Sequence, residues 1–141
     1  MASSTFSGPI QAGTIRDGST NNVGKVVLSK TAVLNQNSTT AVSSTFYLPA
    51  NAQLLDIVAD VLVAFNSATT AVLSVGSAAA GTQYAGSIDA KTAGRTYPTY
   101  SAAQLAAMDD IGSNTSVVAT ITPDGATSAG QVRVTLQYVQ N

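Results

Sequence analysis

The longest mostly apolar run of the chain, residues 53–66, alternates as a β-strand does. Successive residues of a strand point to opposite faces, so one side of this run presents only apolar side chains. That side holds Leu55, Ile57, Ala59, Val61, Val63 and Phe65. Several of the residues in the run are β-branched, which favours a strand over a helix. We predict a central strand of an antiparallel sheet, with this side in the core.

The other side of the same run mixes carboxylates with aliphatic side chains. It holds Leu54, Asp56, Val58, Asp60, Leu62 and Ala64. Such a face is too apolar for open solvent and too charged for a second core. We interpret it as a subunit interface and expect a homo-oligomer, a trimer, with Leu54, Val58 and Leu62 at or near the contact.

Shorter alternating segments, separated by turns rich in Gly, Pro, Asn and Ser, predict further strands. They lie at 25–34, 40–48, near 73–76, 84–90, 115–122 and 131–140. The last of these alternates most cleanly, with Val132, Val134, Leu136 and Tyr138 on one side. A capping box of Ser101 and Gln104 indicates one short helix, with Leu105 and Met108 on one face. Residues 91–100 read as an exposed loop. The pattern predicts an all-β fold, a two-sheet antiparallel β-sandwich of jelly-roll type with one short helix.

The first 22 residues hold few large apolar side chains and cannot form a core of their own. We therefore divide the chain into an extended N-terminal arm, residues 1–22, and a β-sandwich domain, residues 23–141. One interpretation of the arm is a frayed terminus. The other is a segment that lies on a neighbouring subunit, through Phe6, Ile10, Ile15 and Arg16.

Charged residues make up only 9% of the chain, with six bases, seven acids and a formal net charge of −1. The bases are scattered, so no footprint for nucleic acid is present and no nucleic-acid partner is expected. A surface so poor in charge suggests that other chains cover much of it. No signal peptide or apolar stretch long enough for a bilayer is present. We expect a soluble protein made in a cytoplasm, without a membrane partner.

Histidine, cysteine and glutamate are all missing from the sequence. Ser-His-Asp and Cys-His sites and the usual zinc sites are therefore impossible. We expect no enzyme activity, no cofactor and no metal. Two weaker alternatives remain: Asp109 and Asp110 could hold a Ca²⁺ ion with Asn114, and Tyr84, Tyr97 and Tyr100 could form a platform for a sugar. A solvated turn and structural tyrosines are the simpler interpretations of these residues.

Four stretches of the chain resemble the small accessory proteins of tailed-bacteriophage heads, known as decoration, cement or capsid-stabilisation proteins. They are residues 7–10 (Ser-Gly-Pro-Ile) with 12–14 (Ala-Gly-Thr), residues 46–52 (Phe-Tyr-Leu-Pro-Ala-Asn-Ala), residues 74–77 (Ser-Val-Gly-Ser) with Tyr84, and the β-strand ending. The likeness covers most of the chain. It rests on chain length, on a β-rich sequence with much Ser, Thr, Ala and Gly, on the absence of Cys and on the N-terminal arm. It implies a structural virion protein that binds the major capsid protein at the surface of a phage shell and assembles as a trimer.

Two other classes share this texture. A carbohydrate- or receptor-binding module of a phage would use Tyr97, Tyr100 and nearby Asp or Asn side chains. A tail or head-completion component would form rings instead of binding over the whole shell.

Overall fold

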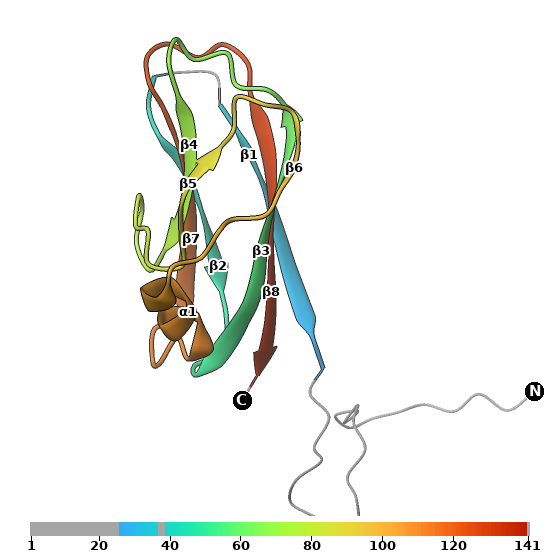
Figure 1. The fold of residues 1–141 in the computed structure, drawn as a ribbon, viewed down its shortest axis with the longest axis vertical. Coiled ribbons are helices and arrows are strands. Elements are labelled where there is room, and N and C mark those ends of the chain that lie inside the picture. The colour runs from blue at the N-terminus through green and yellow to red at the C-terminus, as the bar shows by residue number, and fades with distance from the viewer. Residues whose placement is uncertain (1–25, 37–38, 141) are drawn as a thin grey trace, which may run out of the picture.

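The structure, a computed structural model, describes residues 26–36 and 39–140. These residues form eight strands and one helix (Figure 1). The elements are β1 (Leu28–Asn35), β2 (Val42–Tyr47), β3 (Ala52–Val63), β4 (Ala71–Gly76), β5 (Ala85–Asp89), β6 (Gly94–Thr96), α1 (Ala102–Asp109), β7 (Ser116–Pro123) and β8 (Gln131–Gln140). The predicted strands and helix are all present. The segment 91–100, predicted as a loop, contains β6, which at three residues is too short to show an alternation.

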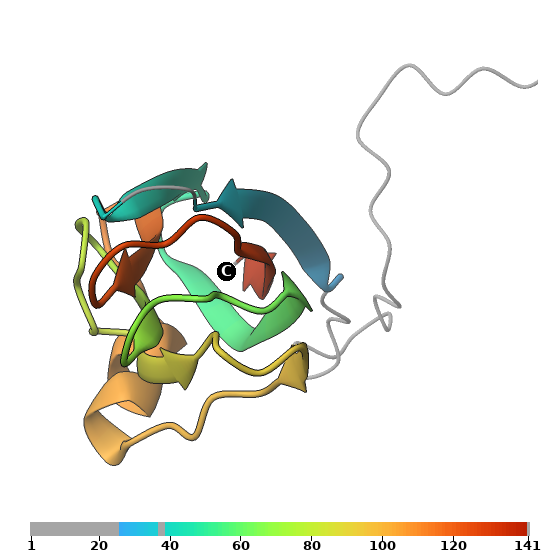
Figure 2. The ribbon, with the colours of Figure 1, turned by 90° about the horizontal axis from the view of Figure 1, so that it is seen from above.

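The strands pair as one long hairpin that has been rolled up. β1 pairs with β8, β2 with β7, β3 with β6 and β4 with β5, all antiparallel. Rolling brings β8 beside β3 and β7 beside β4. Within the described residues this gives two four-stranded sheets, sheet A in the order β1-β8-β3-β6 and sheet B in the order β2-β7-β4-β5. Eight strands connected in this way form a jelly roll, so the predicted sandwich is confirmed (Figure 2).

Two irregularities in β3 change which side chains face the core. The register with β8 shifts between Leu54 and Asp56 and again between Val61 and Val63. Each shift inserts a residue that has no partner, and the alternation reverses beyond it. Leu55 and Val63, predicted in the core, are therefore 42% and 46% exposed, while Leu54 is 3% exposed and belongs to the core.

The central part of β3 faces the core as predicted. Ile57, Ala59 and Val61 lie between the sheets, and Phe65 follows them there just beyond the strand. From β8 the predicted side chains Val132, Val134, Leu136 and Tyr138 join the same core. β8 lies between β1 and β3, so the C-terminal strand is held inside sheet A, as its clean alternation indicated.

The edge strand β1 carries a lysine on its inward side. Lys30 pairs with the inward residue Leu136, but its Nζ reaches the carbonyl of Tyr47 at the end of β2. The side chain thus connects the edges of the two sheets. A lysine at this place also discourages stray pairing of an edge strand, which is the role that its break in the pattern suggested.

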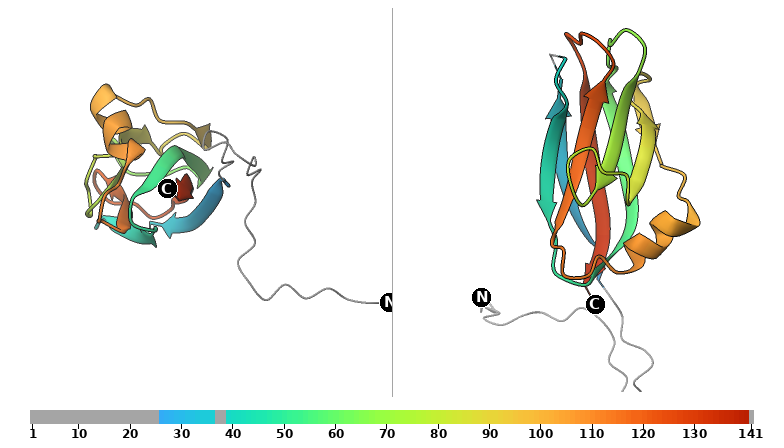
Figure 3. Two further views of the ribbon diagram at one scale, coloured as in Figure 1. Left: turned by 90° about the horizontal axis from the view of Figure 1, so that it is seen from below. Right: turned by 90° about the vertical axis from the view of Figure 1, so that its left-hand side faces the viewer.

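The short helix α1 lies beside the end of the sandwich where β3 begins (Figure 3). Its capping box is present: Gln104 N donates to Oγ of Ser101 at 3.2 Å, and Ser101 N donates to Oε1 of Gln104 at 2.9 Å. Met108 is buried against the core, whereas Leu105 is 54% exposed. The two residues were predicted on one face, but of the two only Met108 contacts the core. The helix is anchored through Met108, through Ala107, which packs against the core while partly buried, and through its cap.

Candidate functional site on the outer face of sheet A

The described residues contain no group of three or more Asp side chains that could hold a metal ion. The proposed Ca²⁺ ligands are instead engaged locally. Asp109 accepts a hydrogen bond from Nε2 of Gln53, and Asp110 accepts one from the backbone of Gly112. Asn114 accepts the backbone N–H of Ser116. Asp109 is the last residue of α1, and Asp110 and Asn114 lie in the connection between α1 and β7.

The outer face of sheet A carries a row of side chains that crosses all four strands. Val33 of β1 is paired with Arg133 of β8, Arg133 with Asp60 of β3, and Asp60 with Arg95 of β6. Since cross-strand partners point to the same face, these four residues lie side by side. The row places one carboxylate between two guanidinium groups.

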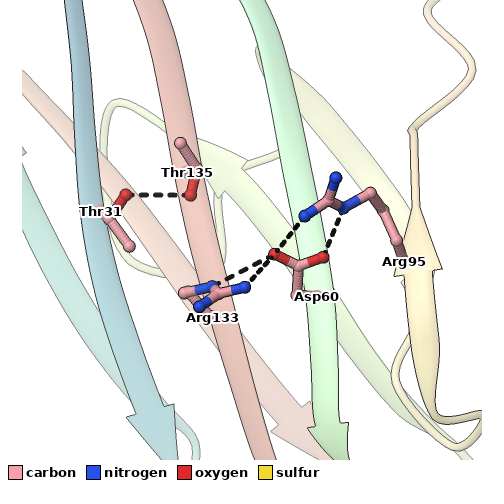
Figure 4. A network of polar contacts seen from close by, with 5 residues as sticks. All are labelled: Thr31, Asp60, Arg95, Arg133 and Thr135. Carbon is pink, nitrogen blue, oxygen red and sulfur yellow. Dashed lines mark hydrogen bonds and ion pairs between the residues drawn. The ribbon is translucent and has the colours of Figure 1, made fainter.

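Asp60 receives hydrogen bonds from both arginines (Figure 4). Arg95 Nε lies 2.6 Å from its Oδ1, and Arg133 Nη2 lies 2.9 Å from its Oδ2. The hydrogen bond from Arg95, and to a smaller extent the one from Arg133, holds the pKa of Asp60 below its ordinary value. The hydrogen bond to Asp60 raises the pKa of Arg95, and a smaller contribution in the same direction comes from a hydrogen bond to Tyr97. The carboxylate is thus ionised at neutral pH, and the row carries a net positive charge.

The adjacent rows toward the start of β3 are also polar. Oγ1 of Thr31 and Oγ1 of Thr135 lie 2.9 Å apart across β1 and β8. Thr135 is in turn paired with Val58 of β3. In the next row the hydroxyl of Tyr100 donates to Oδ1 of Asp56 at 2.8 Å. Both aspartates of β3 therefore have hydrogen-bond partners within the chain.

The three predicted interface residues are separated by the irregularities of β3. Leu54 lies in the core, so its prediction as a surface contact is wrong for this structure. Val58 does point outward, but the chain itself covers it and it is 7% exposed. Leu62, at the second irregularity, is 46% exposed and is the one of the three that offers apolar surface.

The predicted arm contacts Phe6, Ile10, Ile15 and Arg16 lie outside the described residues. The boundary between the arm and the domain at residue 22 lies outside them as well. β1 begins at Leu28.

The three tyrosines proposed for a sugar platform do not come together. Tyr84 is buried in the core, and burial raises the pKa of its hydroxyl. Tyr100 packs partly against the core, and burial, reinforced by the bond to Asp56, raises its pKa too. Tyr97 is 58% exposed and remains available for a ligand.

The arginine–aspartate row was not found from the sequence. Asp60 lies 35 residues from Arg95 and 73 from Arg133, so only the strand register brings them together. One signal was present: Arg133 belongs to the polar side of the last strand, and Asp60 to the polar side of the longest one. An unpaired carboxylate at such a place would require a cationic neighbour.

No protein-family model and no curated protein match the chain. A solved structure shares its fold: a chain of the Cyanophage Pam1 capsid asymmetric unit has a TM-score of 0.57 and 19% sequence identity. The match covers 93% of this chain and 95% of that one. At this identity the likeness establishes a common fold over nearly the whole length of both chains. No helix among the described residues is long and apolar enough to cross a bilayer.

Proposed function

We propose that the protein is a structural component of a phage virion that binds the outer surface of the capsid and stabilises the shell as a homotrimer. The observation that carries this proposal is the shared fold with a chain of the Cyanophage Pam1 capsid asymmetric unit, over 93% of this chain.

The chemistry of the chain supports binding without turnover. The sequence has no His, Cys or Glu, so most nucleophile and acid–base pairs cannot be assembled. Asp56 and Asp60 each bind partners within the chain. A protein that only binds an assembled lattice stabilises it by mass action and needs no catalytic group.

Sheet A is the face that best fits contact with other chains. Seven of the ten exposed large apolar side chains among the described residues belong to residues 26–35 or to β3. These seven are Val26, Val27, Leu28, Val33, Leu55, Leu62 and Val63. Val33, Leu55 and Val63 point outward from sheet A, whereas Leu28 lies on the same side of β1 as Lys30, and Val26 and Val27 precede the strand. Exposed apolar side chains on the outer side of a sheet are typical of an interaction surface. The neighbouring arginine row would add a charged rim to such a contact.

We assign two kinds of partner to the protein, other copies of itself and the major capsid protein. β1 is the longest edge strand, with eight residues against three in β6, six in β2 and five in β5. Among the described residues this edge pairs with no further strand, and a strand added from another chain would replace the contact that Lys30 makes with β2. The arm, through Phe6, Ile10, Ile15 and Arg16, supplies the segment that would reach a neighbour or the shell.

Electron microscopy of intact virions labelled with a gold-tagged antibody against the protein tests this proposal. The virions are those of the phage that encodes the chain. Label distributed over the whole head supports binding to the capsid surface. Label confined to one vertex would indicate a head-completion component, and label at the tail tip a receptor-binding module. Either of those patterns would contradict the proposal.

A further inference from the structure

A hollow lies where the edges of the two sheets meet. It has a volume of about 440 Å³ and is lined by residues 86–89 and 96–99. β5 is an edge strand of sheet B and β6 is an edge strand of sheet A. Figure 2 shows the chain crossing from β5 to β6 and then returning beside this stretch to α1. The hollow is therefore framed by two segments that come from different sheets.

One wall of the hollow contains a β-bulge. Leu73 of β4 is paired with Ile88 and Val75 with Ala85, so Gly86 and Ser87 together face the one residue between them. Ser87 has a φ of 58°, in the left-handed region that non-glycine residues rarely adopt. Bulges of this kind re-aim a side chain and are frequent beside binding sites. Here the side chain that is re-aimed is an exposed hydroxyl in the lining of the hollow.

The groups that line the hollow combine one aromatic ring with several hydrogen-bonding groups. Tyr97 contributes a ring that is 58% exposed, and Pro98 lies next to it. Ser87, Thr96 and Thr99 contribute hydroxyl groups. Asp89 contributes a carboxylate whose Oδ1 accepts the backbone N–H of Lys91 at 3.1 Å. This bond fixes the orientation of the carboxylate and uses one of about four acceptor positions.

These groups disfavour anions and purely apolar ligands. A carboxylate in the lining repels anions. The amine of Lys91 is directed to the carbonyl of Ser67 at 2.7 Å, and the guanidinium of Arg95, which contacts Tyr97, is paired with Asp60. A purely apolar ligand would leave the hydroxyls and the carboxylate without partners. A cyclic ligand that carries several hydroxyl groups and has one apolar face can stack on the aromatic ring and donate hydrogen bonds to the acceptors.

We propose that this hollow binds a neutral saccharide, with Tyr97 stacking on the apolar face of a sugar ring and Asp89 accepting hydrogen bonds from its hydroxyls. Ser87 and Thr99 contact the rim of the same ring. The wall of the hollow formed by β5 belongs to sheet B, whereas seven of the ten exposed large apolar side chains among the described residues lie on β3 or within residues 26–35.

A glycan array probed with the full chain, followed by NMR titration of the best ligand, tests the site. The array holds neutral hexoses, N-acetylhexosamines and bacterial surface oligosaccharides. We expect binding of a neutral glycan, weakened about tenfold or more by Tyr97→Ala and by Asp89→Asn, and largely retained by Tyr97→Phe. Tyr47→Ala is the matched control, because Tyr47 is 68% exposed at the opposite edge of sheet B and should not affect binding.

Three results would overturn the site. The first is no glycan bound on the array and no shift in NMR at millimolar sugar. The second is a bound glycan whose affinity is unchanged in Tyr97→Ala and Asp89→Asn while both variants unfold normally. The third is loss of capsid binding in Tyr97→Ala without any glycan bound, which would make the hollow part of a protein contact.

Discussion

The hydroxyl of Tyr100 donates a hydrogen bond to Oδ1 of Asp56 over 2.8 Å, and it accepts the backbone N–H of Ile57 at 2.9 Å. β6 pairs with β3 only at Ala59–Val61. Beyond the end of this pairing, at Ile57, the hydroxyl of Tyr100 accepts the backbone N–H that a longer β6 would have paired. The backbone N–H of Ile57 also donates to Oδ1 of Asp56 at 2.8 Å, so Tyr100, Asp56 and this N–H form one closed set of hydrogen bonds at the edge of β3.

Removing this hydroxyl should weaken the domain. We predict that Tyr100→Phe lowers the free energy of unfolding by about 1 kcal/mol, the usual net value of one hydrogen bond. Urea denaturation at pH 7 measures the difference. Tyr47→Phe serves as the control, since Tyr47 is 68% exposed and its loss of a hydroxyl should be silent. Equal stabilities of wild type and Tyr100→Phe would contradict the role given to the contact.

The same variant should change the response to alkali. Burial and the bond to Asp56 raise the pKa of Tyr100 in the folded state. The stabilisation is then complete below the ordinary tyrosine pKa of about 10 and is lost as the pH rises above it. Wild type should lose more stability above about pH 10 than Tyr100→Phe does. The variant should still lose some stability in alkali because the pKa of Tyr84 is also raised.

Asp60 should stabilise the domain at neutral pH and not at acid pH. We predict that Asp60→Asn lowers the melting temperature at pH 7 by a few degrees, because two guanidinium groups then face each other without a carboxylate. The pKa of Asp60 is lowered in the folded state, so its contribution is present above the ordinary value near pH 4 and is lost as the pH falls through the lowered one. The difference between variant and wild type should shrink below about pH 4.

The control for this experiment is Asp124→Asn, which removes a carboxylate that forms no ion pair among the described residues. It should leave the melting temperature nearly unchanged at every pH. A constant difference between Asp60→Asn and wild type from pH 7 down to full protonation would contradict the ion-pair explanation.

The sequence was a good guide where strands are regular. β8 has no irregularity against β1, and its inward residues Val132, Val134, Leu136 and Tyr138 were all predicted correctly. The alternation is a property of the strand itself, so one segment suffices to read it. The capping box of Ser101 and Gln104 was equally local and equally reliable.

Prediction failed where the partner strand decides the outcome. The two irregularities of β3 depend on its register with β8, and the pattern of a single strand does not record that register. Leu54, Leu55 and Val63 were therefore placed on the wrong faces. The row of Arg133, Asp60 and Arg95 was missed for the same reason, since its members come from three strands.

The oligomeric state can be tested through Leu62. We predict that the protein is a trimer at micromolar concentration by light scattering, and that Leu62→Ser shifts it toward the monomer. Leu105→Ser is the matched control, because Leu105 is 54% exposed on α1 against 46% for Leu62. A wild-type monomer whose melting point does not depend on protein concentration would contradict the trimer.

The arm can be tested by truncation. We predict that a chain starting at Val23 still unfolds cooperatively and still assembles, because the described core is formed by residues 32–138. It should bind capsid shells much more weakly than the full chain does. The full-length double variant Ile10→Ser with Ile15→Ser is the milder test and should lie between the two. If the truncated chain binds as tightly as the full chain, the arm is a frayed terminus. If it fails to fold, the arm belongs to the sandwich.

The most direct test of the capsid role is the heat stability of phage heads with and without the protein. Heads purified from a phage that lacks the protein are heated with a DNA-binding dye, alone and after purified protein has been added back. We predict that added protein raises the temperature at which DNA becomes accessible, with an effect that saturates at a fixed ratio of protein to capsid subunits. Identical curves of DNA accessibility against temperature with and without the protein, at protein concentrations high enough for the protein to be fully assembled, would contradict the account.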